Sequence, residues 1–271
     1  MLKACSISRN INRQAVQILR QRDISVDAWS GEKSPSKEEL QELLRIYDIL
    51  IIGVKEKITK DMISNIKSRK IIGTLSIGLN HIEKECFESD YVDIVNCPTA
   101  NVTSVAEHIF ALILDLSKRI QEANDLVIEG KGDKKFLRSK PSDICGKTIG
   151  LIGAGNISSK VVDIANIFQM PILCYTAHPG NHEDLIKKGV KFVSLDEVLQ
   201  CSDIVNVSVP LTEQTKNLIS REKVGLLKEN SIFINTSRGE VTDIQALVEL
   251  ADRNPNFYLG LDIDIEQNEE L

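Results

Sequence analysis

Short runs of apolar residues alternate with segments of helical spacing in the first part of the chain. Residues 48–53, 70–74 and 92–95 are rich in isoleucine, leucine and valine, which is typical of buried strands. Residues 36–47 and 60–67 have apolar side chains at helical spacing. Alternation of this kind predicts a parallel sheet with helices on both faces.

A longer helical pattern follows at residues 104–128. Its apolar face comprises Val105, Ile109, Leu112, Ile113 and Leu116. Because this helix is long for one domain, we expect it to link two domains or to form a dimer seam. The polar, glycine-containing segment 130–135 predicts a loop or an arm.

A second series of strands is predicted at 148–152, 172–175, 204–209, 231–235 and 259–263. The fold class is therefore α/β. A length of 271 residues fits two domains, which we place at 1–100 and 101–265.

Charge and composition narrow the function classes. The net charge of −6 argues against a nucleic-acid partner, because phosphate binding needs a basic face. No apolar run is long enough to span a bilayer and no signal-peptide core is present, so we expect no membrane partner and a cytoplasmic location. The 6 cysteines form no C-x-x-C pair, so they are expected to be buried thiols and not zinc ligands.

A glycine-rich turn joins the strand at 148–152 to the next helix. It has the spacing G-x-G-x-x-S, with Gly153, Gly155 and Ser158 at the defining positions. Gly153 permits a tight turn, and Gly155 lets the backbone approach a pyrophosphate at the helix N-terminus. The alternative is an ordinary ligand-free turn, but the surrounding strands and helix favour a dinucleotide site.

The end of the strand at 172–175 bears on the choice of cofactor. An acidic residue there would bond the ribose hydroxyls of NAD, but this sequence has Thr176. No carboxylate at this position repels a 2′-phosphate, and Thr176 and His178 can donate hydrogen bonds to one. NADP is therefore favoured over NAD, while a solvated loop histidine is the alternative for His178.

Several motifs in a fixed order resemble those of the D-isomer-specific 2-hydroxyacid dehydrogenases, a family that includes phosphoglycerate and glycerate dehydrogenases. The motifs are residues 74–82, residues 101–108, the glycine-rich turn, residues 202–215 and residues 234–239. The resemblance covers almost the whole chain. It implies a flavodoxin-like substrate domain and a Rossmann-like, doubly wound NAD(P)-binding domain.

The resemblance also implies a function. The chain would be an NAD(P)-dependent oxidoreductase that transfers a hydride between the cofactor and a small 2-hydroxy or 2-oxo acid, and it would form a homodimer. Ile77 and Gly78 would offer backbone amides to the substrate carboxylate, and Asn101 would line the substrate cleft. Asn156 and Ile157 would offer backbone amides to the pyrophosphate of the cofactor. Pro210 and Thr215 would border the cofactor. Thr236 and Asp262 would hold its nicotinamide end.

Arg238 is the central candidate for catalysis. By resemblance it would clamp the carboxylate and the carbonyl of the substrate. Elementary chemistry agrees, because a guanidinium binds a carboxylate through two parallel hydrogen bonds and polarises a carbonyl as hydride arrives. A surface ion pair is the alternative for this residue.

The sequence departs from the family pattern near residue 271. The family has a glutamate in a D-V-F-x-x-E-P stretch and a catalytic histidine beyond it, so this chain resembles a C-terminally truncated member. If Asp262 is the motif aspartate, Gln267 takes the glutamate position with Glu266 beside it. If Asp264 is the motif aspartate, Glu269 takes the glutamate position. We prefer Asp262 and keep Glu266 and Glu269 as candidate catalytic residues.

The missing histidine leaves a second class of function open. His81 and His108 are weaker candidates for proton transfer than for packing or structural roles. A non-catalytic protein that binds NAD(P) and a carboxylate is the alternative to an enzyme, and a dimeric scaffold is a third possibility. The presence of Arg238, Asn101 and the loop with Ile77 favours the enzyme, because cofactor binding alone would not need them.

Overall fold

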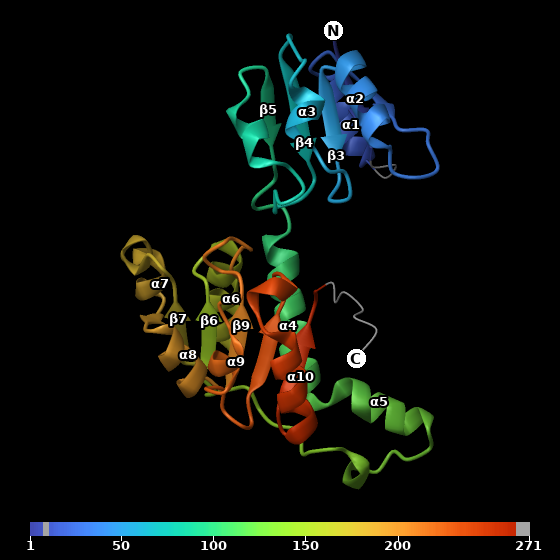
Figure 1. The fold of residues 1–271 in the computed structure, drawn as a ribbon. Coiled ribbons are helices and arrows are strands. Elements are labelled where there is room, and N and C mark those ends of the chain that lie inside the picture. Colours follow the sequence, from blue (N-terminus) through green and yellow to red (C-terminus); the bar gives the residue numbers. More distant parts are fainter. Residues whose placement is uncertain (8–10, 264–271) are drawn as a thin grey trace. The chain divides into compact units, whose positions relative to one another are not determined.

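The computed structural model describes residues 1–7 and 11–263 (Figure 1). The chain divides into two compact units, Met1–Ala100 (unit 1) and Asn101–Leu271 (unit 2). No helix among the described residues is long and apolar enough to cross a membrane.

Unit 1 is built on a sheet of five parallel strands in the order β2-β1-β3-β4-β5, which is the flavodoxin-like order. The strands are β1 (Leu2–Ser6), β2 (Ile24–Ala28), β3 (Ile49–Ile52), β4 (Lys70–Thr74) and β5 (Val92–Val95). The helices are α1 (Arg13–Arg20), α2 (Lys37–Ile46), α3 (Lys60–Ile63) and the 3₁₀ turn η1 (Lys84–Glu88).

The predicted elements of unit 1 are confirmed except in extent. A capping box formed by Ser36 and Glu39 begins α2, within the predicted range 36–47. The helix predicted at 60–67 is wrong in length, because α3 ends at Ile63. Met62 and Ile63 are the buried residues of this helix, and Ile66 packs against the same core from the turn that follows it.

Unit 2 is built on six parallel strands in the order β11-β10-β9-β6-β7-β8, the Rossmann order. The strands are β6 (Ile149–Ile152), β7 (Ile172–Tyr175), β8 (Lys191–Phe192), β9 (Ile204–Val207), β10 (Ile232–Asn235) and β11 (Tyr258–Leu261). The longer helices are α4 (Val102–Lys118), α5 (Ile120–Ile128), α6 (Asn156–Ile167), α8 (Leu195–Cys201) and α10 (Ile244–Arg253). Shorter elements are η2 (Lys134–Phe136), η3 (Pro179–Asn181), α7 (Glu183–Lys187), α9 (Arg221–Val224) and η4 (Gly239–Val241).

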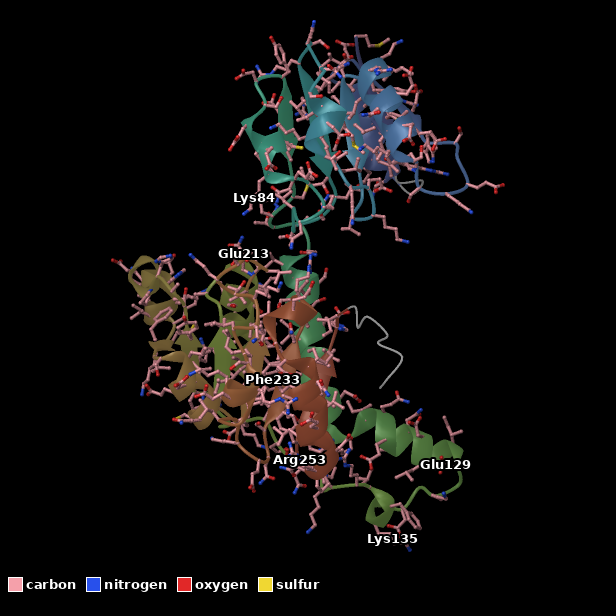
Figure 2. All side chains as sticks on the ribbon, in the orientation of Figure 1. Lys84, Glu129, Lys135, Glu213, Phe233 and Arg253 are labelled. Atoms are coloured by element: carbon pink, nitrogen blue, oxygen red, sulfur yellow. The ribbon has the colours of Figure 1, made fainter. Side chains whose placement is uncertain are left out.

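Both faces of the second sheet are covered, because alternate residues of its central strands point into different cores. Ile232 and Ile234 of β10 pack with α4 and α6, whereas Phe233 packs with α8 and α10. Figure 2 labels Phe233, which is fully buried within this layered unit. The continuous apolar strands of the sequence are thus explained by burial on both sides.

The single helix predicted at 104–128 is wrong. It is broken at Arg119, whose backbone has the left-handed values φ 60° and ψ 40° and separates α4 from α5. The Arg119 guanidinium carbon lies 3.2 Å from the centre of the Tyr258 ring, and the residue is only 7% exposed. A buried cation–π contact with β11 is the physical reason that we assign to the break. Beyond the break, α5 leads away from the sheet (Figure 1).

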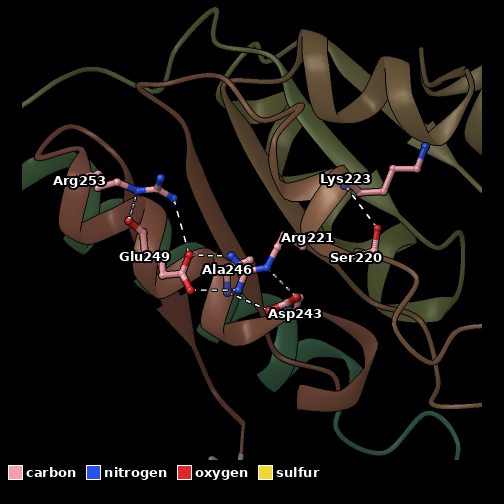
Figure 3. A network of polar contacts seen from close by, with 7 residues as sticks. All are labelled: Ser220, Arg221, Lys223, Asp243, Ala246, Glu249 and Arg253. Atoms are coloured by element: carbon pink, nitrogen blue, oxygen red, sulfur yellow. Dashed lines mark hydrogen bonds and ion pairs between the residues drawn. The ribbon is translucent and has the colours of Figure 1, made fainter. Parts of the chain in front are cut away.

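A network of charged side chains fixes α10 against α9 (Figure 3). Arg221 donates two hydrogen bonds to the Glu249 carboxylate, at 2.6 and 3.0 Å. Asp243 caps α10 by accepting from the Ala246 amide at 2.8 Å. Because Asp243 directly follows the segment between β10 and α10, this network fixes one end of that segment.

The cysteines only partly match the expectation of buried thiols. Cys5, Cys86 and Cys174 are buried, but the prediction is wrong for three others, which are exposed: Cys97, Cys145 and Cys201. These three lie in connections or at a helix end, where no second layer covers them. All six are free thiols, and burial raises the pKa of Cys174 to about 12.

We expect three thiols of the native protein to react rapidly with a thiol-specific disulfide reagent at pH 8, and six after denaturation. Buried thiols are inaccessible, and their raised pKa leaves little thiolate to attack the reagent. Absorbance of the released chromophore counts them. Cys97→Ser should lower the native count to two, and rapid reaction of four or more thiols in the parent would contradict this burial pattern.

Candidate functional site

The predicted cofactor residues follow the strands of unit 2 and share one edge of its sheet. Parallel strands all end at the same edge, so the segments after β6, β7, β9, β10 and β11 emerge together. The strand order reverses between β6 and β9. The residues that the topology gathers at this edge are Gly153, Gly155, Asn156, Ile157, Thr176, His178, Pro210, Thr215, Thr236, Arg238 and Asp262.

The glycine-rich turn has the geometry that an anion site requires. Gly153 has φ 107°, and a Cβ there would lie 2.7 Å from the Ser208 carbonyl oxygen. A Cβ on Gly155 would meet no atom within 4 Å, so this glycine faces open space. Gly155 is the N-cap of α6 and offers no capping side chain, which leaves the amides of Asn156 and Ile157 available to a ligand. These residues fit the pyrophosphate of a dinucleotide.

A pocket lies beside this turn, on the side of β7. Its lining residues are Ala154, Gly155, Asn156, Ser159, Gly180, His182, Glu183, Asp184 and Leu185. Thr176 is half-buried at the end of β7, and His178 is exposed two residues later. The carboxylates of Glu183 and Asp184 were missed by sequence reasoning, because nothing in the spacing shows that α7 begins beside the glycine-rich turn.

Pro210 and Thr215 belong to one tight turn after β9. The Thr215 hydroxyl accepts from the Thr212 amide at 2.8 Å and donates to the Pro210 carbonyl. Thr215 therefore closes the turn through its own side chain, and this fixes the conformation of the segment after β9.

Arg238 lies on a loop that Asn235 holds from below. The Asn235 side chain is fully buried and makes contacts in both directions. Its Oδ1 accepts from the Ser237 amide at 2.9 Å, and its Nδ2 donates to the Arg238 carbonyl at 3.1 Å and to Thr242 Oγ1 at 3.4 Å. The guanidinium of Arg238 is exposed, and its Nη1 donates to the Ser237 carbonyl at 2.8 Å. The loop is rigid at its base while its cation is accessible.

Asn235 lies in the family motif at residues 234–239, but the sequence alone assigned it no role. A fully buried asparagine at the end of an apolar strand was the available signal, because buried polar groups are retained where they are hydrogen-bonded.

Asp262 comes directly after β11, beside the N-terminal part of α4. Its amide donates to the Asn235 carbonyl at 3.0 Å, and its carboxylate oxygen lies 3.7 Å from His108 Nε2. His108 is therefore an imidazole at the same edge. Asn101 is the N-cap residue of α4, less than two turns before His108. Glu266 and Glu269 lie outside the described residues.

Ile77 and Gly78 belong to unit 1, in the loop after β4. The Ile77 carbonyl accepts from Asn96 Nδ2 at 2.9 Å, and the Gly78 carbonyl accepts from Ser76 Oγ at 2.7 Å. Neither the Ile77 nor the Gly78 amide donates a hydrogen bond within the described part of the chain. Two adjacent free amides of this kind can bind a carboxylate.

The neighbouring His81 is the titratable group of this loop. Burial lowers its pKa, although the Coulomb effect of the buried Glu56 raises it in part. The ring is therefore neutral near pH 7. Among the described residues, no group of histidines, cysteines or carboxylates has the arrangement of a metal site.

The sequence matches a family model described as D-isomer specific 2-hydroxyacid dehydrogenase, NAD binding domain, over residues 110–270. It is 34% identical over 253 residues to hydroxypyruvate reductase of Thermotoga maritima, covering 93% of this chain and 80% of that protein. It is 30% identical to glyoxylate reductase of Thermococcus litoralis, covering 98% of this chain and 82% of that protein.

Solved structures show the same relationship. An acyclic imino acid reductase in complex with NADPH and D-Arg has a TM-score of 0.86 at 28% identity, covering 99% of this chain and 85% of that one. D-lactate dehydrogenase of Aquifex aeolicus, complexed with NAD and lactic acid, has a TM-score of 0.78 at 30% identity, covering 99% and 78%. The α/β fold inferred from the sequence is thereby confirmed.

Proposed function

Because this chain belongs to the D-isomer-specific 2-hydroxyacid dehydrogenase family, we propose that it reduces a small 2-oxo acid with a nicotinamide cofactor, and catalyses the reverse oxidation. The observation that carries the proposal is Arg238, an accessible cation on a loop that Asn235 anchors, at the sheet edge that also holds the glycine-rich turn. The names of the relatives point to hydroxypyruvate, glyoxylate and lactate-type acids as substrates. Nothing in the comparisons supports a non-catalytic binding protein.

Each residue has a distinct task in this proposal. The amides of Asn156 and Ile157 hold the pyrophosphate, and the bound nicotinamide supplies the hydride. Arg238 binds the substrate carboxylate and stabilises negative charge as it develops on the carbonyl oxygen. By the family resemblance, we assign the amides of Ile77 and Gly78 in unit 1 to the substrate carboxylate and Asn101 to a substrate contact.

Reduction of the carbonyl also needs a proton. Glu266 and Glu269 stay predictions for this step. His108 is a third candidate, because its Nε2 lies 3.7 Å from the Asp262 carboxylate, which can orient the ring. In this arrangement the imidazole lies at the edge to which we assign the nicotinamide.

Arg238→Ala should lower kcat/KM for a 2-oxo acid by roughly 10²–10³-fold, because it removes two charge-assisted hydrogen bonds. The Kd for the cofactor should stay within about twofold, since the pyrophosphate is held elsewhere. Initial rates of NAD(P)H oxidation and fluorescence titration measure these quantities. Arg253→Ala is the matched control, because this arginine is exposed on α10 and should leave both quantities unchanged. An active Arg238→Ala enzyme would contradict the assignment.

We infer further that the cofactor is NADP(H) in preference to NAD(H). Thr176 stands where a carboxylate would repel a 2′-phosphate, and His178 follows it. Glu183 and Asp184 line the pocket beside the glycine-rich turn and oppose a second negative charge, so the preference is expected to be modest.

Thr176→Asp should shift the ratio of the Kd values for NADH and NADPH toward NADH by about tenfold, because it adds a negative charge where the 2′-phosphate is expected. Asparagine has nearly the same shape as aspartate but no charge, so Thr176→Asn should leave the ratio close to that of the parent. Titration of cofactor fluorescence gives both constants. Equal effects of the two substitutions would exclude a charge-based role for position 176.

We also propose that the chain forms a homodimer through α5 and η2. This arm exposes four large apolar side chains: Ile120 at 56%, Val127 at 65%, Ile128 at 76% and Phe136 at 50%. Figure 2 shows Glu129 at the far end of α5 and Lys135 in the returning segment, both away from the sheet of unit 2. A second copy of the chain would remove this surface from water.

Ile128→Asp should convert the dimer to a monomer at micromolar concentration, because a buried unpaired charge costs several kcal/mol. Sedimentation velocity measures the mass. Ile167→Asp is the control, because Ile167 is 77% exposed on α6, which is not part of the arm, and should leave the mass unchanged. A parent that is monomeric at micromolar concentration would exclude this interface.

A further inference from the structure

A chain of hydrogen bonds links His81 to the backbone of Gly78. His81 Nε2 lies 3.1 Å from Thr74 Oγ1, which lies 2.8 Å from Ser76 Oγ. Ser76 Oγ in turn lies 2.7 Å from the Gly78 carbonyl oxygen. An imidazole is thus connected through two hydroxyl groups to the loop whose free amides we assign to the substrate carboxylate.

Proton counting gives this chain a direction. The Gly78 carbonyl can only accept, so Ser76 uses its one hydroxyl proton there. Ser76 Oγ must then accept from Thr74, which uses the single proton of Thr74. Thr74 Oγ1 must therefore accept from His81, so Nε2 carries a proton. Because the ring is neutral near pH 7, this selects one of its two tautomers.

Thr74 has no spare hydrogen-bonding capacity in this arrangement. Its hydroxyl donates to Ser76 Oγ and accepts from His81 and from the Ser76 amide, the latter at 3.4 Å. The residue is 2% exposed, so bulk water cannot replace a lost partner. An unpaired buried hydroxyl is destabilising, and each link therefore constrains the next.

The hydrogen-bond chain affects the loop conformation because Gly78 has no Cβ to restrict its backbone. The peptide before Gly78 is held by Asn96, which donates to the Ile77 carbonyl, and the peptide after it is held by Ser76. Both peptide planes that flank Gly78 are therefore fixed by side chains of unit 1. Without the second bond, the glycine could rotate and misalign its amide.

We propose that His81 is a positioning residue: as the Nε2–H tautomer it anchors the Thr74–Ser76 hydrogen-bond chain, and through that chain it holds the loop of Ile77 and Gly78 in the conformation that receives the substrate carboxylate. The identity of the ligand rests on the proposed function. The tautomer and the hydrogen-bond chain do not depend on the proposed function.

The first experiment measures the tautomer by ¹⁵N NMR of the imidazole nitrogens in the full chain at pH 7.5, with His81→Gln to assign the signal. A protonated Nε2 is expected, and its signature should disappear in Thr74→Val or revert toward that of a solvated histidine. An Nδ1–H tautomer in the parent would overturn the proposal. This readout needs neither substrate nor turnover, so it tests the tautomer and the hydrogen-bond chain even if the parent reduces no 2-oxo acid.

The second experiment separates positioning from folding. Ser76→Ala should raise KM for the 2-oxo acid about tenfold, the effect of loosening one hydrogen-bonded contact to the ligand, and leave the Kd of NADPH unchanged. Thr74→Val should act in the same way, and Thr74→Ser, which keeps the hydroxyl, should restore KM. Ser64→Ala is the matched control, because Ser64 Oγ also donates to a carbonyl of unit 1, that of Asp61, at 3.0 Å.

The outcomes distinguish the two proposals. An active parent with an unchanged KM in Ser76→Ala would overturn the positioning role and leave the proposed function intact. An inactive parent with the Nε2–H tautomer would overturn the proposed function and leave the hydrogen-bond chain supported.

Discussion

Parallel pairing of the strands is the constraint on which both units depend. Every strand pair in both sheets is parallel, so every strand delivers its following segment to the same edge of its own sheet. In unit 2 this brings together segments that are far apart in sequence, from the glycine-rich turn to Asp262. The burial of both sheet faces has the same origin, because each crossover returns through a helix that covers a face. The chemistry of the edge is then decided by a few residues, and the strands behind them need only be apolar.

Buried polar side chains convert this topology into defined loop conformations. Asn235 lies at the end of β10 and holds the loop of Arg238, while Thr74 lies at the end of β4 and holds the loop of Gly78. Both are almost inaccessible to water, at 0% and 2% exposure. A change of loop conformation would therefore leave a buried polar atom without a hydrogen-bond partner. In both units a loop that we assign to ligand binding is therefore secured from below by the last residue of a strand.

The strands and the glycine-rich turn could be predicted from the sequence because their signals are local. Continuous apolar runs report burial on both faces, and a glycine with positive φ reports a tight turn. The break at Arg119 could not be predicted, because Tyr258, the cation–π partner to which we assign it, is distant in sequence and becomes a neighbour only after folding. The hydrogen-bond chain from His81 to Gly78 was hidden for a related reason. Its residues lie close together in sequence, but their connection depends on side-chain torsions that no residue pattern encodes. Of the candidate site, the residue types and their edge were predictable, and the supporting contacts were not.

The overall negative charge of the chain is compatible with a site for small anions, because the relevant fields are local. Charges at the surface are screened over about 8–10 Å at physiological ionic strength, so a distant carboxylate has little effect on a bound phosphate or carboxylate. The free amides at the start of α6 and in the loop of Gly78 act at hydrogen-bond distance and carry partial positive charge whatever the net charge is. Arg238 adds one full positive charge at the edge of the unit 2 sheet that also holds the start of α6. Nucleic acid would require a continuous basic surface, whereas a dinucleotide and a small acid require only these few donors. The charged residues that do bear on specificity are therefore the near ones, Glu183 and Asp184, and the residue at position 176.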